Sequence, residues 1–500
     1  MSGKLGPSSL PVLPLLLWGV PPGLILLLQQ EGVPFEVIVK AHPMALRRGR
    51  FVLYDSRRIS TRAVRSITSE EHLLIDVDSL RRGESIDPFR AVVDSRSTLS
   101  VWSLGEATLT ERVARHNRSA IRRRVLGRLR DKVARSGGLW ARLGAFPHPF
   151  RSAFNLRVDL DEPIPEDYFR FAAARDPLAD CTTHFVSTHA YGGEGAVLRD
   201  LRHYDTQSHG HFHHVYRNAG ANRRNLRRAH DILVAAGIEP VGFAAPSGRW
   251  NAGLDRAIEE LGYEYSSDFQ VGYDDVPFFP WLGDRFSKVL QVPIHPVCEG
   301  LFLEAGIGDP RRIAEHLVSV LRAKVDAGEP AFLYGHPERR LAWMPEVLKT
   351  LSRELNSYEL IWRATLTEFA RWWHWRSQRR WSVVPRTEQR FEIQFEEWDA
   401  TFPLTIEVVR GAHVAGLPVT GPRLPLPLEG LAYERRAARQ DLPTPSAVGS
   451  PLGLKAALRS AIDWETVTPL DELPNGSIAD RLKRGLRCWR DRAVARKARR

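Results

Sequence analysis

Four histidines lie within the seven residues from Ser208 to His214. Imidazole is the commonest protein ligand for zinc-like metals. His209 and His213 are four residues apart, so a helical turn would place both rings on one face, as in other metal sites with this spacing. A solvated polar loop or a tag-like tract is the alternative. Other ligands or proton-transferring groups are needed to favour the metal site.

Two further segments supply such groups. Asp159 and Asp161 stand at the end of a predicted strand, where side chains two residues apart point to the same side. Two carboxylates in one site can divide the work, one binding metal and one taking a proton from water. A buried strand-like segment, 332–335, delivers His336 to its carboxyl end. A lone histidine there is more often structural, but in this company it is a candidate general acid.

The elements that must position these residues alternate between strand and helix from about 152 to 376. Such alternation predicts a mainly parallel sheet or barrel. The predicted strands are Ala153–Leu160, Thr182–Thr188, Tyr204–Ser208, Val241–Ala245, Tyr263–Ser267, Val289–Pro293, Ala331–Gly335 and Leu360–Trp362. Two of the helices end at Gly237 and Gly262, and glycine is common just past a helix end. Catalytic groups of barrels lie at the carboxyl ends of strands, where all these candidates fall.

In their order and residue patterns these segments resemble the polysaccharide deacetylase family, also called the NodB-homology or family-four carbohydrate esterases. Val158–Glu162 stands where the family has Thr-Phe-Asp-Asp-Gly, and His209 with His213 matches its His-Ser/Thr-x-x-His motif. Residues 244–248 replace its Arg-Pro-Pro-Tyr-Gly, and His336 matches its strand ending in histidine. The resemblance covers residues 152–376, under half of the chain.

The resemblance implies a distorted (β/α)7 barrel and a divalent metal held by Asp161, His209 and His213. It implies Asp159 as the general base and His336 as the general acid for the leaving amine. Zinc is the expected metal, with cobalt, nickel and manganese as alternatives. The implied activity is removal of an acetyl group from an N-acetylated sugar or oligosaccharide of a bacterial surface polysaccharide or its precursor.

The chain departs from the family's pattern at two places. Leu160 separates two acids that are usually adjacent, which leaves the metal ligand open. Ala244 replaces the arginine that fixes the base in the family, and Arg249 could substitute for it from the following turn. Alternative ligands are Asp159, Glu162, His211 and His214.

Length, net charge and cysteine count restrict the number of domains, the partners and the compartment that we expect. Five hundred residues are too many for one compact core, so we expect two to three domains. The net charge of +12 suggests phosphate, nucleic acid or an anionic membrane as a neighbour. No nucleic-acid motif accompanies the charge, so we do not expect nucleic acid to be the partner. Three widely spaced cysteines argue against a disulfide framework and predict a reducing, cytoplasmic compartment.

We predict five regions along the chain. They are an N-terminal α/β, Rossmann-like domain (1–110), a basic helical linker (111–150), the deacetylase-like barrel (151–376), a small β module (388–435), and a Pro-containing linker with a basic amphipathic tail (436–500). The helix of the basic linker is expected to follow the first region directly, over 111–136. No Gly-x-Gly-x-x-Gly or Walker loop supports nucleotide binding.

The uncharged run Leu10–Leu28 could pass for a membrane span or a signal peptide. Its four prolines make it a poor helix. We therefore expect strand Val12–Trp18, a turn, helix Leu24–Gln30 and a second strand at Phe35–Val39, which together form a βαβ unit. Further strands are expected at Arg50–Tyr54 and His72–Val77.

The tail from Ser477 to Arg500 is predicted to be a basic amphipathic helix, because Ser477 and Asp480 resemble a capping box. Its apolar face comprises Ile478, Leu482, Leu486 and Trp489, with arginines around it. Such a helix can lie in a membrane interface held by anionic lipid, which would make the protein peripheral at the inner membrane. A frayed basic terminus is the alternative.

Three other functions stay open beside the deacetylase. The same site could hydrolyse another amide or an O-ester. A catalytically degenerate barrel could bind glycan without hydrolysis, which Ala244 and the altered acidic motif favour. A basic scaffold for nucleic acid would show binding with a steep salt dependence.

Overall fold

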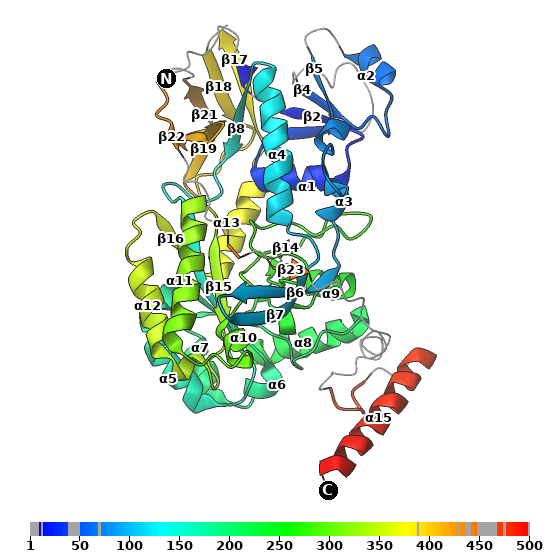
Figure 1. Ribbon diagram of the computed structural model, residues 1–500, viewed down its shortest axis with the longest axis vertical. Coiled ribbons are helices and arrows are strands. Elements are labelled where there is room, and N and C mark those ends of the chain that lie inside the picture. The colour runs from blue at the N-terminus through cyan, green and yellow to red at the C-terminus, as the bar shows by residue number, and fades with distance from the viewer. Residues whose placement is uncertain are drawn as a thin grey trace.

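The computed structural model is drawn in Figure 1, coloured from the N-terminus to the C-terminus. The residues it describes are 10–11, 14–38, 51–68, 72–387, 390–427, 430–435, 442–443, 445–447, 468–473 and 477–498. Within those residues, every helix is too short or too polar to cross a lipid bilayer.

The N-terminal residues form a small parallel α/β unit with strand order β3-β2-β4-β5. Its strands are β2 (Leu15–Trp18), β3 (Phe35–Ile38), β4 (Phe51–Tyr54) and β5 (Leu73–Asp76). Its helices are α1 (Pro22–Glu31), α2 (Thr61–Ile67), the short η2 (Val77–Leu80) and α3 (Pro88–Ala91). Pro22 lies in the first turn of α1, where a missing N–H costs nothing. The predicted βαβ unit is therefore confirmed.

A hairpin and a long helix follow. Strands β6 (Ser97–Leu104) and β7 (Ala107–Ala114) pair antiparallel, and β23 (Ser446–Ala447) joins β6. Residues 111–114 belong to β7, so the helix expected over 111–136 begins later, as α4 (Arg118–Arg135). Asn117 sets this start because its side chain accepts the Ala120 N–H at 2.9 Å. Ala114 N donates to Phe269 O at 3.0 Å, which places the hairpin beside the barrel.

The central sheet is parallel throughout, in the order β14-β13-β12-β11-β10-β9-β15, with β16 also paired to β9. Its strands are β9 (Ser152–Leu160), β10 (Thr182–Val186), β11 (Asp205–Ser208), β12 (Gly242–Phe243), β13 (Tyr265–Ser266), β14 (Leu290–Gln291), β15 (Ala331–Gly335) and β16 (Ile361–Arg363). His295 N donates to Phe332 O at 2.8 Å, which links the chain after β14 to β15 at the other edge. The predicted distorted barrel and all eight of its predicted strands are confirmed.

Helices surround this sheet (Figure 1). They are α5 (Pro165–Arg175), η3 (Asp176–Cys181), α6 (Thr188–Tyr191), α7 (Gly195–Leu201), α8 (Ala219–Ala235), η4 (Pro246–Gly248), α9 (Ala252–Glu260), α10 (Glu299–Glu304), α11 (Pro310–Ala327), η5 (Leu341–Trp343), α12 (Pro345–Leu355) and α13 (Leu366–Gln378). Gly237 and Gly262 have φ of 79° and 78° just past α8 and α9, as expected of glycines that end helices.

The β-rich residues after the barrel share a sheet with residues that precede it. Strands β17 (Trp381–Thr387), β18 (Arg390–Phe395) and β21 (Arg423–Leu426) form one antiparallel sheet. A second sheet has the order β1-β8-β19-β20-β22, with β1 (Leu10–Pro11), β8 (Gly138–Leu143), β19 (Leu404–Arg410), β20 (His413–Val419) and β22 (Glu434–Arg435). The buried Trp140 of β8 pairs with Val409 of β19, so packing joins these distant segments.

The tail forms α15 (Ile478–Ala498), coloured red in Figure 1. Asp480 N donates to Ser477 Oγ and Ser477 N donates to Asp480 Oδ2, both at 3.1 Å, so the predicted capping box is confirmed. Most of the expected Pro-containing linker, including residues 448–467, lies outside the described residues.

Candidate metal and proton-transfer site

The candidate side chains meet at the carboxyl ends of three barrel strands. Asp159 is near the end of β9 and Asp161 directly follows that strand. His209 follows β11 and His336 follows β15. Because the strands are parallel, their carboxyl ends share one edge of the barrel, and the four side chains are brought together there.

Asp161, His209 and His213 form a group that can hold a metal ion. The Asp161 Oδ1 atom lies 3.2 Å from His209 Nε2 and 3.3 Å from His213 Nε2. Despite this proximity, Asp161 Oδ1 is buried with no partner of good hydrogen-bond geometry among the described residues. Two imidazole nitrogens and one carboxylate oxygen that converge in this way match the ligand chemistry of zinc.

The histidine cluster is an irregular loop rather than the helical turn expected from the spacing of His209 and His213. Gly210 bends the chain with φ of 82°, a conformation that other residues adopt only at a cost. Asn225 of α8 then holds the loop, because its side chain accepts the Phe212 N–H at 2.7 Å. The bend brings both rings to Asp161 without a helix.

His209 is oriented by Ala244, which stands where the resembled family has an arginine. Its Nδ1 lies 2.8 Å from the carbonyl oxygen of Ala244, and the ring is almost fully buried. A proton on Nδ1 donated to this carbonyl leaves the lone pair on Nε2 directed at Asp161, an arrangement common to metal-binding histidines.

The other histidines of the cluster occupy other surroundings. His211 is buried, and its Nδ1 lies 3.0 Å from Thr188 Oγ1. His214 is also buried, with its ring against that of Tyr216. Of the described histidines in this cluster, His209 and His213 are the ones placed beside Asp161.

Asp159 is buried beside the guanidinium of Arg157, two residues earlier on the same strand. Arg157 Nε lies 2.7 Å from Asp159 Oδ1, and Arg157 Nη2 lies 2.5 Å from Asp159 Oδ2. Arg157 is fixed in turn by the Ser267 carbonyl at 2.5 Å and by the rings of Phe185 and Tyr334. Burial alone would raise the pKa of Asp159, but Arg157, His209 and His336 together outweigh burial and lower the pKa.

Arg157 therefore supplies, from strand β9, the cation that Ala244 cannot supply. The sequence had suggested Arg249, in the following turn, as a possible substitute for the missing arginine. The signal for Arg157 was present in the sequence, because its spacing of two from Asp159 puts both side chains on one side of the strand.

His336 is held by Glu299 at the start of α10. Glu299 Oε1 lies 2.8 Å from His336 Nδ1 and accepts the His336 backbone N–H at 2.9 Å. His336 Nε2 points toward the metal group, 3.8 Å from Asp161 Oδ2. Burial lowers the pKa of His336, but Glu299 and Cys298 together outweigh burial and hold the pKa well above its usual value. Sequence reasoning missed Glu299, which no local pattern marks.

Two further carboxylates are close in the sequence to residues of the site: Glu162 follows Asp161, and Glu338 lies two residues after His336. Glu162 is half-buried, and its Oε2 lies 3.3 Å from Arg339 Nη1. Glu338 is buried, accepts a hydrogen bond from Tyr191 at 2.5 Å, and has a pKa that burial raises to about 7. Neither belongs to the group formed by Asp161 and the two histidines.

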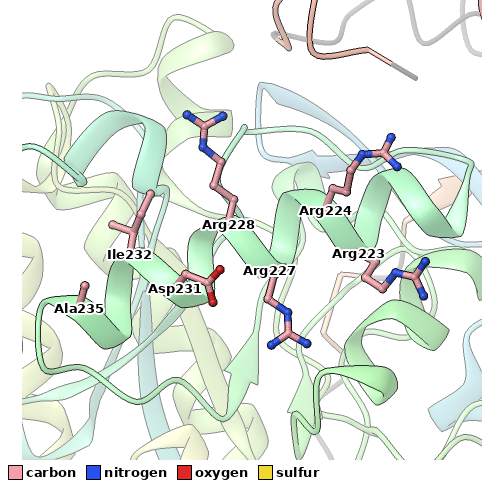
Figure 2. A pocket seen from close by; sticks show the side chains of 7 residues that line it. All are labelled: Arg223, Arg224, Arg227, Arg228, Asp231, Ile232 and Ala235. Carbon is pink, nitrogen blue, oxygen red and sulfur yellow. The ribbon is translucent and has the colours of Figure 1, made fainter. Parts of the chain in front are cut away.

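A separate surface hollow runs along α8 (Figure 2). It is lined by Arg223, Arg224, Arg227, Arg228, Asp231, Ile232 and Ala235. Because it is shallow and contains none of the candidate metal or proton-transfer groups, it is distinct from the site at the strand ends.

Comparisons with known proteins give structural matches alone. No protein-family profile matches the sequence, and no curated protein matches it. A putative polysaccharide deacetylase from Mycobacterium smegmatis aligns with a TM-score of 0.40 and 19% identity, over 48% of this chain and 95% of that chain. A probable polysaccharide deacetylase from Pseudomonas aeruginosa PAO1 gives 0.39 and 19%, over 45% and 91%. A CE4 family pseudoenzyme from Bacillus anthracis gives 0.33 and 11%, over 45% and 66%.

Proposed function

We propose that this protein is a metal-dependent hydrolase that removes the acetyl group from an N-acetylated sugar. The observation that carries the proposal is the convergence of Asp161, His209 and His213, with a buried Asp161 oxygen that has no partner of good hydrogen-bond geometry in the described part of the chain. An ionised acid and a histidine, each held by its own partner, stand on the same barrel edge.

In this proposal Asp161, His209 and His213 would hold the metal. Zinc suits a ligand set of two imidazoles and one carboxylate, and cobalt, nickel and manganese are the alternatives. When bound, such an ion polarises the acetyl carbonyl and lowers the pKa of a water molecule.

Asp159 would take a proton from the attacking water. Its lowered pKa keeps it ionised at neutral pH, and Arg157 fixes its orientation. Each carboxylate oxygen keeps a lone pair beyond the one that Arg157 occupies. As the water oxygen bonds to the acetyl carbon, the proton passes to Asp159.

His336 would complete the reaction by protonating the leaving nitrogen. Glu299 holds its Nδ1, so Nε2 is the atom that donates the proton. Its raised pKa favours the protonated ring that this role requires. The carbon–nitrogen bond breaks, acetate leaves, and the sugar amine remains.

For the substrate we infer an acetylated sugar of a bacterial surface polysaccharide or its precursor, on the resemblance of residues 152–376 to the family. We place the reaction in the cytoplasm, because Cys181, Cys298 and Cys488 are all free of disulfides.

A glycan-binding barrel without activity is the second candidate, favoured by Ala244 in place of the family's arginine. The ion pair of Arg157 with Asp159 weakens that case, because Arg157 supplies a cation beside the base from strand β9, the strand that also carries Asp159.

Acetate release from a panel of N-acetylated and O-acetylated oligosaccharides tests the proposal. We expect release from an N-acetylated sugar, and a loss of about a thousandfold in Asp159→Asn, which keeps the shape but removes the base. Asp176→Asn, a change at the start of η3 outside the site, is the matched control and should keep full activity. The second candidate would be favoured if the folded wild type showed no hydrolysis and if Asp159→Asn bound glycan as well as the wild type does. Release from O-acetylated sugars alone would make the enzyme an esterase.

A further inference from the structure

Helix α15 exposes the face that a soluble helix would normally bury. The side chains of Ile478, Leu482 and Trp489 are 79%, 64% and 66% exposed, and Leu486 is also exposed. Spaced by three to four residues, they form one continuous apolar stripe. Contiguous apolar patches of this kind on a protein surface mark sites of interaction.

The opposite face of α15, which carries arginines, is the one turned toward the protein. Arg487 is buried, and Arg484 Nη1 donates to the Leu473 carbonyl at 2.9 Å. The helix is therefore inverted relative to an ordinary amphipathic helix, and its inward contacts hold the apolar stripe outward.

Cations border the exposed stripe. Arg481 and Arg492 are exposed on one side of it, and at 100° per residue Lys483 and Arg490 fall on the other. In all, α15 carries eight Lys and Arg residues against two Asp. A second copy of this face would set like charges against each other at both borders, so the charge pattern opposes pairing between copies.

The basic surface continues onto α8. Arg228 of α8 pairs with Glu472 at 2.7 Å, which ties the segment before α15 to that helix. The outer side of α8 is exposed and arginine-rich, and Figure 2 shows Arg223, Arg224, Arg227 and Arg228 extending from it.

We propose that α15 binds an anionic lipid bilayer, with its apolar stripe buried at the boundary between headgroups and acyl chains. Trp489, Leu482 and Ile478 would enter the interface, and the bordering cations would meet anionic headgroups. A helix bound in this way lies along the surface of the bilayer. The inference does not depend on the proposed catalytic activity.

Sedimentation of the full-length protein with lipid vesicles tests this. We expect at least tenfold more bound protein on vesicles with about one-third phosphatidylglycerol than on pure phosphatidylcholine, with binding weakened by salt. The double change Leu482→Ser and Trp489→Ser should lower binding by about tenfold. Leu360→Ser, at an exposed leucine before β16, is the matched control and should bind as the wild type does.

Circular dichroism and thermal unfolding verify that the variants fold, which is expected because both changed side chains are exposed. Equal binding to the two kinds of vesicle, or full binding by the folded double variant, would overturn the proposal. A dimer in light scattering that the double variant abolishes would assign the stripe to a second copy instead.

Discussion

At the residue scale, the ion pair of Arg157 and Asp159 holds the proposed general base of the barrel. Both groups are buried, so each depends on the other to offset the loss of water. The pair also fixes Asp159 in place through two hydrogen bonds from one planar guanidinium. In the proposed reaction Arg157 would therefore be a positioning residue that acts through Asp159.

We predict that Arg157→Gln lowers kcat by about a hundredfold with a smaller change in KM, because the base is misplaced while sugar binding persists. The free energy of unfolding should fall by about 3 kcal/mol, since Asp159 is left buried without its cation. Arg157→Lys keeps the charge but not the bidentate contact, and should recover part of kcat. Steady-state kinetics and urea unfolding check this, with the exposed Arg339→Gln as control. An Arg157→Gln enzyme with wild-type kcat would exclude the role.

The sequence predicts the polar groups of the site better than the groups that hold them. Asp161, His209 and His213 are brought together, and their residue types and order along the chain are enough to indicate metal binding. Glu299 could not be predicted, because it lies 37 residues before His336 and meets it through the folding of α10 against β15. Such partners depend on tertiary packing, which local spacing does not encode.

At the element scale, the loop from Ser208 to His214 brings His209 and His213 to Asp161, where a helical turn was expected to do so. Gly210 is its critical residue: a Cβ there would lie 3.0 Å from Asn225 Nδ2, in addition to the strain of its positive φ. The loop is therefore fixed on one side by backbone conformation and on the other by the side chain of Asn225.

Gly210→Ala should accordingly weaken metal binding by about tenfold and destabilise the protein by about 1–2 kcal/mol, the cost of a left-handed conformation. Isothermal titration with zinc and thermal unfolding measure the two effects. Gly193→Ala is the matched control, since nothing lies within 4 Å of a Cβ there and its φ is ordinary. Equal zinc affinity in both variants would mean that the loop does not preorganise the ligands.

The barrel strands were predictable because buried parallel strands read as short apolar runs between turn residues. The pairing of β8 with β19 was not, since it joins Trp140 to Val409 across the whole barrel sequence. The hairpin of β6 and β7 was also missed. Its β7 end was assigned to the basic helix, because Ala107–Ala114 alternates only weakly between apolar and polar residues.

At the scale of the whole molecule, buried charges connect the N-terminal unit to the rest. Glu31 at the end of α1 contacts Arg142 of β8 at 2.5 Å, and Arg142 contacts Glu407 of β19 at 2.7 Å. Arg122 of α4 contacts Asp275, in the loop that follows β13, at 2.8 Å. Removing one member takes a counter-charge away from buried partners, so these contacts couple the parts of the chain.

Glu31 gives this network a pH dependence. Burial raises its pKa, but Arg142, Arg130 and Arg122 outweigh burial and lower it from 4.5 to about 2. A folded-state pKa below the unfolded value means that the stabilisation is complete above pH 4.5 and is lost as the pH falls toward 2.

We predict that Glu31→Gln costs about 3 kcal/mol of unfolding free energy at pH 7, and much less near pH 2, where the wild type has also lost the charge. Urea unfolding at both pH values measures this. The exposed Glu36→Gln of β3 should change neither value by more than about 0.5 kcal/mol. A constant difference between Glu31→Gln and the wild type at the two pH values would show that the charge is not the cause.

The central claim is that Asp161, His209 and His213 hold a metal ion, and metal content by mass spectrometry tests it most directly. The wild type, His213→Ala and the control His189→Ala, an exposed histidine outside the group, would be purified and reconstituted with zinc. We predict about one zinc ion per chain in the wild type and in His189→Ala, and a sharp loss in His213→Ala. A wild type that stays free of metal after reconstitution, or a folded His213→Ala that keeps its zinc, would contradict the claim.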